Sequence, residues 1–306
     1  MYKSYFDISE EVQQALKNHN PVVALESTLI SHGLPYPKNL DVANSSLEAV
    51  RSSGSVPATI AIINGRIKVG LNDNDMQILA TNNTVEKVSK HNLLIALSNK
   101  NHAATTVAST IYLASQIGIK FFATGGIGGA HLNSENTFDI SADLNQLSKT
   151  FMFVICSGAK SILDLDKTHE ILETLGVARI GFKTDFMPGF WYYQTDKKVD
   201  YNFNKIENLA NYLKICNEVN QKGSTLIFNP VPQEKAIKKE LIEKWIRISI
   251  EKSKTESIIG KELTPYLIKE INLLSGNKTL GANMALIINN ALLAGQLAVK
   301  YFKNLI

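Results

Sequence analysis

The stretch FMFVICSGAKSILDLDKTHEILETLGVARIGF, from Phe151 to Phe182, decides the fold. Its first six and last five residues are mostly apolar, which is typical of strands buried on both faces. Between them, Ser161 to Leu175 has the apolar spacing of an amphipathic helix. A strand, a helix and a second strand in this order predict an α/β fold, in which the strands are parallel and the helix covers the sheet.

The same alternation extends in both directions along the chain. Further strands are predicted at Pro21–Glu26, Ala58–Ile63, Lys120–Ala123 and Thr225–Phe228, and further helices at Thr105–Gln116, Lys205–Asn220, Glu234–Ser253 and Asn283–Tyr301. Asn64-Gly65 lies between two strand-like runs, which predicts one hairpin. We therefore expect a three-layer α/β/α architecture with a mixed, mostly parallel central sheet. No linker divides the chain, so a single domain over residues 1–306 is expected, with 183–204 as an irregular segment that could cover a site.

Composition narrows the class of protein. The chain has 306 residues, 44% hydrophobic and 20% charged, which excludes intrinsic disorder for most of its length. Two cysteines in apolar surroundings argue against a disulfide framework and for the cytoplasm. The net charge of +4 neither requires nor excludes a polyanion, and no nucleic-acid partner is expected. Residues 1–11 lack a signal-peptide pattern, and asparagines interrupt the apolar stretch 282–299, so no membrane association is expected either.

Polar residues that follow apolar strands are the first site candidates, because ligands of open α/β sheets bind beyond the carboxyl ends of the strands. Lys160 follows one such strand, at the predicted start of the helix from Ser161. There the helix dipole and desolvation would both favour a neutral amine, as Schiff-base chemistry requires. The alternative is a surface lysine paired with Asp164.

Glu26 ends another apolar strand, where a partly desolvated carboxyl group would suit general acid catalysis. The alternative is a carboxylate that accepts hydrogen bonds from the next turn. The glycine-rich run from Thr124 to His131 could bind a phosphate through backbone amides, with Thr124, His131 and Ser141 as donors, or it could be a tight turn without a ligand. It lacks the third glycine of a dinucleotide-binding motif.

Other candidates carry weaker signals. Asp139 and Asp143 are four residues apart across a predicted helix start, so both could face a hydrated Mg²⁺ or Mn²⁺, although aspartate there is more often a cap. Lys87 could bind phosphate as a point charge, and Asn283 opens the predicted last helix. The six histidines show no zinc-binding pattern.

Several long strings of the sequence closely resemble one family. They are VALESTLISHGLPYP from Val23, VPATIAIINGRIKVGL from Val56, ATTVAST from Ala104, FATGGIGGAH from Phe122, TFDISADL from Thr137, CSGAKSILDL from Cys156 and IGKELTPYL from Ile259. The family is that of the pseudouridine-5′-phosphate glycosidases, which also includes the indigoidine-synthesis A proteins. The resemblance spans about Glu11 to Tyr301.

The resemblance implies an enzyme that reversibly cleaves the C–C glycosidic bond of pseudouridine 5′-phosphate to uracil and ribose 5-phosphate. It also implies a role for each matching residue: Lys160 as the nucleophile that forms a Schiff base, Glu26 as the acid-base residue, Asp139 as the Mn²⁺ ligand, and Lys87, Val107, Ser141, Ala142, Asp143, Thr124, His131 and Asn283 as substrate-binding residues. Mg²⁺ would also suit the metal site. A homotrimer is implied as well, and a separate pseudouridine kinase is expected because no kinase domain is attached.

Two other functions remain open. A lysine-dependent aldolase or lyase acting on another sugar phosphate would share the Schiff-base chemistry. A non-enzymatic nucleotide-binding regulator would use the phosphate site without a covalent adduct. Uracil release distinguishes the glycosidase from both.

Overall fold

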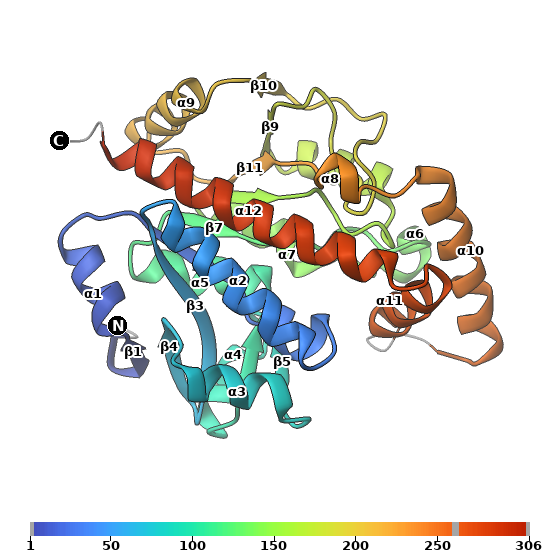
Figure 1. Ribbon diagram of the computed structural model, residues 1–306, viewed down its shortest axis with the longest axis horizontal. Helices are drawn as coiled ribbons and strands as arrows, with labels where there is room; N and C mark the ends of the chain where they lie inside the picture. The colour runs from blue at the N-terminus through green and yellow to red at the C-terminus, as the bar shows by residue number, and fades with distance from the viewer. Residues whose placement is uncertain (1–2, 259–262, 304–306) are drawn as a thin grey trace.

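The apolar runs of the sequence form the middle of one large mixed sheet. The computed structural model describes residues 3–258 and 263–303, and in this part of the chain eleven strands pair in the order β1-β4-β3-β2-β7-β8-β11-β9-β10, with β6 beside β3 and β5 beside β6 (Figure 1). The strands are β1 Phe6–Ile8, β2 Val22–Leu25, β3 Val56–Ile63, β4 Arg66–Val69, β5 Glu86–Val88, β6 Ala103–Thr105, β7 Phe121–Ala123, β8 Phe153–Cys156, β9 Ala178–Phe182, β10 Tyr201–Phe203 and β11 Thr225–Phe228.

Most of the strand pairs are parallel, as predicted. Among the described strands, two pairs are antiparallel, and β3 belongs to both: it pairs with β4 and with β6. The β3–β4 connection is the predicted hairpin, and both of its turn residues have positive φ, 51° at Asn64 and 69° at Gly65. Positive φ at both turn residues is typical of the two-residue hairpin turn that joins twisted antiparallel strands. The Asn-Gly pair therefore makes β3 and β4 antiparallel, and the sheet is mixed, as predicted.

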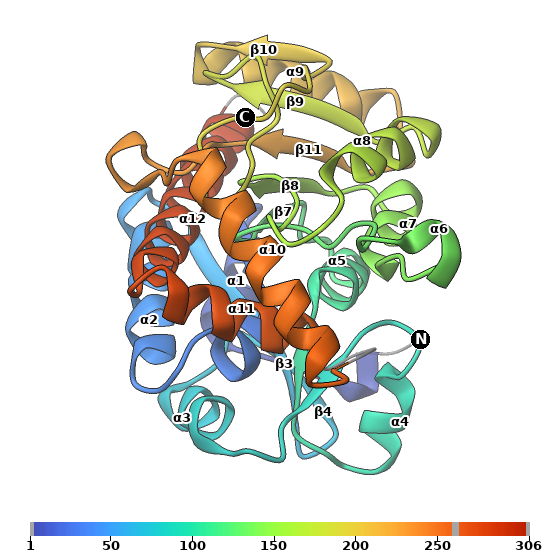
Figure 2. The same cartoon turned by 90° about the vertical axis from the view of Figure 1, so that its right-hand side faces the viewer.

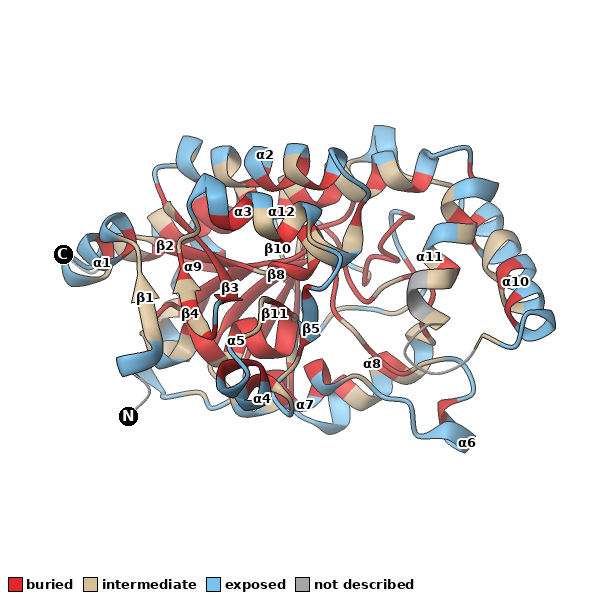
Figure 3. Ribbon diagram, turned by 90° about the horizontal axis from the view of Figure 1, so that it is seen from below, coloured by how far each residue is buried: buried red, intermediate tan, exposed pale blue. Residues whose placement is uncertain are grey.

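Helices cover both faces of the sheet, which confirms the three-layer α/β/α expectation (Figure 3). α2, α9 and α12 pack on one face and α5, α7 and α8 lie on the other. The helices are α1 Glu10–Lys17, α2 Lys38–Ser52, α3 Asp73–Thr81, α4 Leu93–Ser98, α5 Val107–Gln116, α6 Ser134–Thr137, α7 Ala142–Lys149, α8 Leu165–Thr174, α9 Ile206–Glu218, α10 Lys239–Thr255, α11 Leu263–Leu274 and α12 Lys278–Lys303. A π-helical segment, Leu29–Gly33, follows β2.

The central strands are apolar throughout because each side of them is buried. In β8, Phe153 and Ile155 pack with α9 and α12, whereas Val154 and Cys156 join the core on the opposite face. Phe121, Phe153 and Tyr301 form an aromatic cluster with ring centroids 5.1 to 5.7 Å apart. Burial on both faces explains why these strands could be located from composition alone.

α12 is the helix that crosses the centre of the molecule. Within the described residues it is the one helix long and apolar enough, by length and composition, to cross a membrane, and half of its most apolar window is buried inside the fold. It packs against β2, β7 and β8 and between α2 and α9 (Figure 1). This is the environment of a core helix, as the asparagines in its sequence suggested. α10 and α11 form a separate helical pair beyond the sheet (Figure 3).

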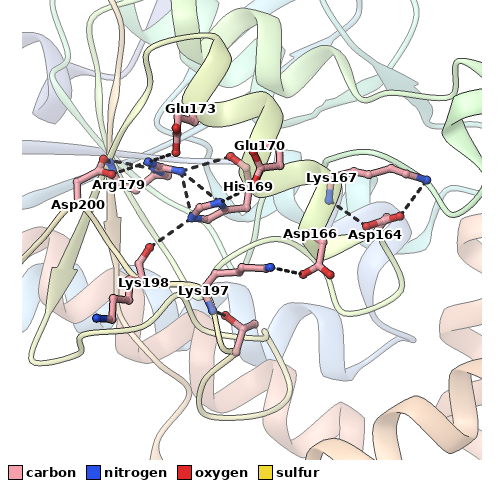
Figure 4. A network of polar contacts seen from close by, with 11 residues as sticks. Asp164, Asp166, Lys167, His169, Glu170, Glu173, Arg179, Lys197, Lys198 and Asp200 are labelled. Atoms are coloured by element: carbon pink, nitrogen blue, oxygen red, sulfur yellow. Dashed lines mark hydrogen bonds and ion pairs between the residues drawn. The ribbon is translucent and has the colours of Figure 1, made fainter.

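The predicted irregular segment 183–204 leaves β9 and returns as the short strand β10. Its returning end is fixed by a polar network around Arg179 of β9, which forms ion pairs with Asp200 and Glu173 (Figure 4). Lys197 pairs with Asp166 at 3.3 Å, and the backbone oxygen of Lys198 contacts the His169 ring. The segment is therefore tied to α8 at this end, while its tip packs at the strand ends, where the Phe190 amide donates to the Ser157 oxygen at 3.0 Å.

Candidate active site

Three neighbouring parallel strands bring the main site candidates together. Glu26 follows β2, Thr124 follows β7, and Lys160 lies four residues beyond the end of β8. Since β2, β7 and β8 are adjacent in the sheet, their carboxyl ends place these residues at the same edge. This edge faces the side of the molecule where α10 and α11 lie (Figure 2).

The cavity at this edge has two adjoining chambers. The apolar chamber is lined by Leu25, Phe190, Trp191, Ile287 and other apolar residues, together with Thr124, His32 and Asn283. The polar chamber is lined by Thr106, Val107, His131, Ser141, Ala142 and Asp143. Glu26, Lys87 and Lys160 line both chambers, so these three residues stand at the boundary.

Glu26 is held by hydroxyl groups. The Thr28 hydroxyl donates to one of its carboxylate oxygens and the Thr124 hydroxyl donates to the other, both in short contacts. The alternative drawn from the sequence, a carboxylate bound by the amides of the next turn, is therefore not what fixes this side chain. Its orientation depends on the strand ends of both β2 and β7.

Lys160 reaches the cavity from a turn, and the expectation that it opens a helix is wrong. α8 begins at Leu165, with Asp164 as its N-cap, because the Asp164 carboxylate accepts from the Lys167 amide at 3.0 Å. The Asp164 side chain also pairs with the Lys167 ammonium at 3.1 Å, rather than with Lys160. The helix dipole thus does not act directly on Lys160, whose backbone amide donates to the Ile127 oxygen at 3.1 Å.

The charges around the boundary act on one another. Much of the Lys87 surface is open to the cavity, yet the protein around its ammonium group lowers the pKa of Lys87, and the nearby Lys160 charge lowers it further. Burial also lowers the pKa of His131; Asp139 opposes this change, and Lys160 and Lys87 add to it. His32 shows the same direction, since desolvation and then Lys87 lower its pKa. The cavity is therefore a positively polarised environment that disfavours additional protons on its imidazoles.

The polar chamber contains the N-termini of two helices. α5 begins at Val107 behind its N-cap Thr106, and α7 begins at Ala142 behind its N-cap Ser141. Helix N-termini present free amides and the positive end of a dipole, which suits an anion. The predicted residues Val107, Ser141 and Ala142 are thus brought together with Lys87 and His131.

Asp143 ties the walls of this chamber together. It is buried, and its two carboxylate oxygens accept from the Ala108 amide at 2.9 Å and from the Gly128 amide at 2.8 Å. One side chain on α7 therefore fixes both the start of α5 and the glycine-rich run. Asp143 therefore lines the cavity and also holds two separate backbone segments together.

Close packing accounts for the glycines of the run 125–129. A Cβ atom on Gly126 would lie 2.6 Å from the Phe190 ring, and one on Gly128 would lie 2.2 Å from the Ser141 hydroxyl. The same applies to Gly129, where Thr168 approaches to 2.3 Å. The tight-turn alternative thus explains these glycines, while the helix N-termini at the cavity are those of α5 and α7.

Asp139 and Asp143 do not form the pair that their spacing suggested. α7 begins at Ala142, so Asp139 precedes the helix and the helical repeat does not apply to it. The Asp139 side chain is half exposed, with a carboxylate oxygen 3.9 Å from Nδ1 of His131. Among the residues that the structure describes, no group of three or more His, Cys, Asp and Glu side chains is placed to hold a metal. A single exposed carboxylate fits only an ion that keeps most of its water ligands.

The apolar chamber contains residues that the sequence did not single out. Phe190 and Trp191, from the segment 183–204, form its wall, and Trp191 donates to the Asn283 side chain at 2.6 Å. The prediction that Asn283 opens the last helix is wrong, because α12 begins at Lys278 and carries Asn283 on its second turn. A run of four aromatic residues, Phe190 to Tyr193, directly after Gly189 in an otherwise irregular segment was the available signal for this wall.

Comparison with known proteins identifies the family of the chain. The family described as indigoidine synthase A like protein matches residues 11–300. The chain belongs to this family. The family match includes residues 259–262, part of the string quoted from Ile259, which lie outside the described residues.

Relatives of the family match almost the whole length of the chain. Proteins named pseudouridine-5′-phosphate glycosidase from Caldanaerobacter subterraneus subsp. tengcongensis and from Staphylococcus aureus are each 46% identical, and the matches cover 97 to 98% of this chain and 97% of each relative.

Solved structures of the family share the fold. A crystal structure of the prealnumycin C-glycosynthase AlnA in complex with ribulose 5-phosphate is 35% identical, with a TM-score of 0.91 and 98% of each chain covered. An indigoidine synthase A-like protein from Thermotoga maritima is 33% identical, with a TM-score of 0.85, covering 92% of this chain and 93% of that one.

Proposed function

We propose that this protein is an enzyme that cleaves the C–C glycosidic bond of pseudouridine 5′-phosphate with water, reversibly, to give uracil and ribose 5-phosphate. The observation that carries the proposal is the convergence of Lys160, Glu26 and Lys87 on the boundary between an apolar and a polar chamber. The names of the curated relatives support the substrate, and the sugar phosphate bound by the C-glycosynthase supports the class of ligand.

The two chambers suit the two ends of this substrate. The helix starts at Val107 and Ala142, with Lys87, would bind the phosphate group. The uracil ring would lie in the apolar chamber against Phe190 and Trp191. This placement leaves the anomeric carbon C1′ at the boundary, beside Lys160 and Glu26.

A carbon leaving group explains why a lysine is needed. Ordinary glycosidases protonate a leaving oxygen with one of two carboxyl groups, but in pseudouridine 5′-phosphate the leaving atom is C5 of uracil. We propose that the neutral amine of Lys160 bonds to C1′ while Glu26 protonates the ring oxygen, so that the ribose opens. Glu26 then takes a proton from the new ammonium and delivers it to C5.

The remaining steps follow from electron balance. The nitrogen lone pair forms a C1′=N bond as the C1′–C5 bond breaks, and uracil departs. Water then adds to the iminium, with Glu26 as base, and ribose 5-phosphate and free Lys160 are released. The hydroxyls of Thr28 and Thr124, which bind the Glu26 carboxylate, orient it for these transfers.

A divalent ion would add to the phosphate end of the site. We propose Mn²⁺ or Mg²⁺ at Asp139, held mainly through water, where it would offset negative charge on the substrate. Asp139→Asn and a chelator should then each reduce turnover, and metal titration followed by isothermal calorimetry should lose its binding signal in the variant. An unchanged binding isotherm for Asp139→Asn would exclude this placement.

Uracil release tests the function directly. Purified protein mixed with pseudouridine 5′-phosphate should produce uracil, measured by ultraviolet absorbance and chromatography, and Lys160→Ala should produce none while it keeps the wild-type melting temperature. Borohydride with ribose 5-phosphate should add a stable mass to the Lys160 peptide. An adduct without uracil release would favour an aldolase or lyase, and phosphate-ligand binding without an adduct would favour a regulator.

The cellular setting is also a proposal. We propose that the protein works in the cytoplasm as a homotrimer and receives its substrate from a separate pseudouridine kinase. The mass in solution, measured by light scattering, tests the trimer, and a dimer or monomer at assay concentrations would exclude it.

A further inference from the structure

Asn290 of α12 is a buried amide that joins the ends of three strands. Its exposed fraction is 0%, and it lies where β7, β8 and β11 end. Its side-chain nitrogen donates to the Thr124 backbone oxygen at 2.8 Å and to the Ser157 hydroxyl at 3.1 Å. Its side-chain oxygen accepts from the Asn229 side-chain nitrogen at 3.0 Å.

The groups around Asn290 form a closed network. The Ser157 hydroxyl donates to the Asn229 backbone oxygen at 2.8 Å, and the Asn229 amide donates to the Cys156 oxygen at 2.9 Å. Backbone bonds continue for one residue beyond the ladder, since the Thr124 amide also donates to the Ile155 oxygen at 3.0 Å, and the Asn290 side chain adds a link that reaches three strand ends at once. A buried amide that has donors and acceptors on different strands must be fully bonded, because unpaired buried polar atoms are costly.

The partners of Asn290 lead to both reactive residues. Thr124 carries the hydroxyl that donates to Glu26, and its backbone oxygen is the one that Asn290 holds. Ser157 begins the turn that ends in Lys160 three residues later, and its backbone amide donates to the Gly125 oxygen at 3.0 Å. One side chain therefore bridges the segment that orients Glu26 and the segment that carries Lys160, in addition to the backbone bonds between them.

We propose that Asn290 is a positioning residue that sets the distance between Glu26 and Lys160 from the opposite side of the strand ends. It is not among the residues that line the two chambers, so it acts on the reaction through the groups that it bonds, of which Thr124 and Ser157 lead to Glu26 and Lys160. This inference rests on the proposed function for its activity readout. Misplacement of reacting groups by about 1 Å costs about 10²-fold in rate.

Asn290→Asp is the sharpest test, because it keeps the shape and replaces the donor toward the Thr124 oxygen by an acceptor. A matched control exists at Asn289, the preceding residue, whose side-chain nitrogen makes a single long bond of 3.5 Å, to the Pro230 oxygen, in the part of the chain that the structure describes. We expect Asn290→Asp to lower kcat about 10²-fold with KM changed less than about threefold, and Asn289→Asp to leave kcat within about twofold.

A pH series adds a readout that a general loss of stability would not give. When protonated, the introduced carboxyl group can donate to the Thr124 oxygen again, so the ratio of variant to wild-type kcat should be higher at low pH than at high pH. Asn290→Ala, which introduces no charge, should lose kcat without this dependence. If Asn290→Asp and Asn290→Ala both keep wild-type kcat, or if Asn289→Asp loses as much, the positioning role is wrong.

Hydrogen exchange separates this inference from the proposed function. Without any substrate, Asn290→Asp should speed exchange in the peptides 124–128 and 157–160 relative to Asn289→Asp. Wild-type protein that releases no uracil would refute the proposed function alone. Unchanged exchange in both peptides would refute the positioning role, whatever the activity.

Discussion

Asp143, in the first turn of α7, and Asp139, which precedes this helix, should differ in how far the same substitution changes stability. Asp143→Asn replaces one of two carboxylate oxygens by an NH₂ group that must face either the Ala108 amide or the Gly128 amide, and both of these are donors. A hydrogen bond to a charged group contributes about 1.5–3 kcal/mol, and a buried donor without a partner costs about 1–3 kcal/mol. We therefore expect Asp143→Asn to lower the free energy of unfolding by about 3 kcal/mol.

The assay is thermal unfolding followed by circular dichroism, with uracil release measured on the same samples. For a chain of this size, 3 kcal/mol corresponds to a loss of about 6 °C in Tm. Asp139→Asn is the control, since its half-exposed carboxylate accepts from no backbone amide among the residues that the structure describes, and its Tm should stay within about 1 °C of wild type. A Tm for Asp143→Asn within about 1 °C of wild type would refute the claim that this carboxylate joins α5 to the glycine-rich run.

Three further changes probe the cavity. Lys87→Met should raise KM by about tenfold or more with a smaller change in kcat, because it removes a charged phosphate donor, and steady-state kinetics measures both. The pKa of His131 is lowered in the folded protein, so the unfolded chain binds a proton at this histidine first as the pH falls. The free energy of unfolding should therefore decline below about pH 6.5, the usual pKa of histidine. His131→Gln should flatten the decline in Tm between pH 7 and pH 5. Gly126→Ala should cost about 1–3 kcal/mol and weaken substrate binding, because the new methyl group displaces the Phe190 ring; an unchanged Tm and KM would contradict this packing.

The central strands could be predicted because strands that are buried on both faces consist almost entirely of apolar residues. β9 and β11 match their predicted bounds, and the Asn64-Gly65 turn has the backbone that its residues favour. The edge strands β1, β5 and β10 were missed, since three residues with partly exposed side chains carry no clear apolar run. The buried strand β6 was missed as well, because its three residues, Ala103 to Thr105, are too few to show a pattern. Helix starts were misplaced where tertiary structure selects the cap: the Asp164 cap moved the start of α8 away from Lys160.

The site could be assembled only in part from the sequence. The polar residues that follow β2, β7 and β8 were found because strand ends are where an α/β sheet binds ligands. Trp191 and Asn290 were not, since each reaches the strand ends from a segment distant in sequence. The aromatic residues after Gly189 gave a local signal for Trp191, whereas nothing in the local pattern around Asn290 reveals its contacts. The spacing of Asp139 and Asp143 misled because a helical repeat holds only inside a helix.

The position of α12 along the chain has a consequence for biosynthesis. On the ribosome, the residues that form β2, β7, β8 and β11 emerge well before those of α12, yet α12 covers these strands and supplies both Asn283 and Asn290. A partly translated chain therefore exposes an apolar sheet face with no competent cavity behind it. Until that last long helix docks, the growing polypeptide is a substrate for chaperones and proteases rather than a catalyst.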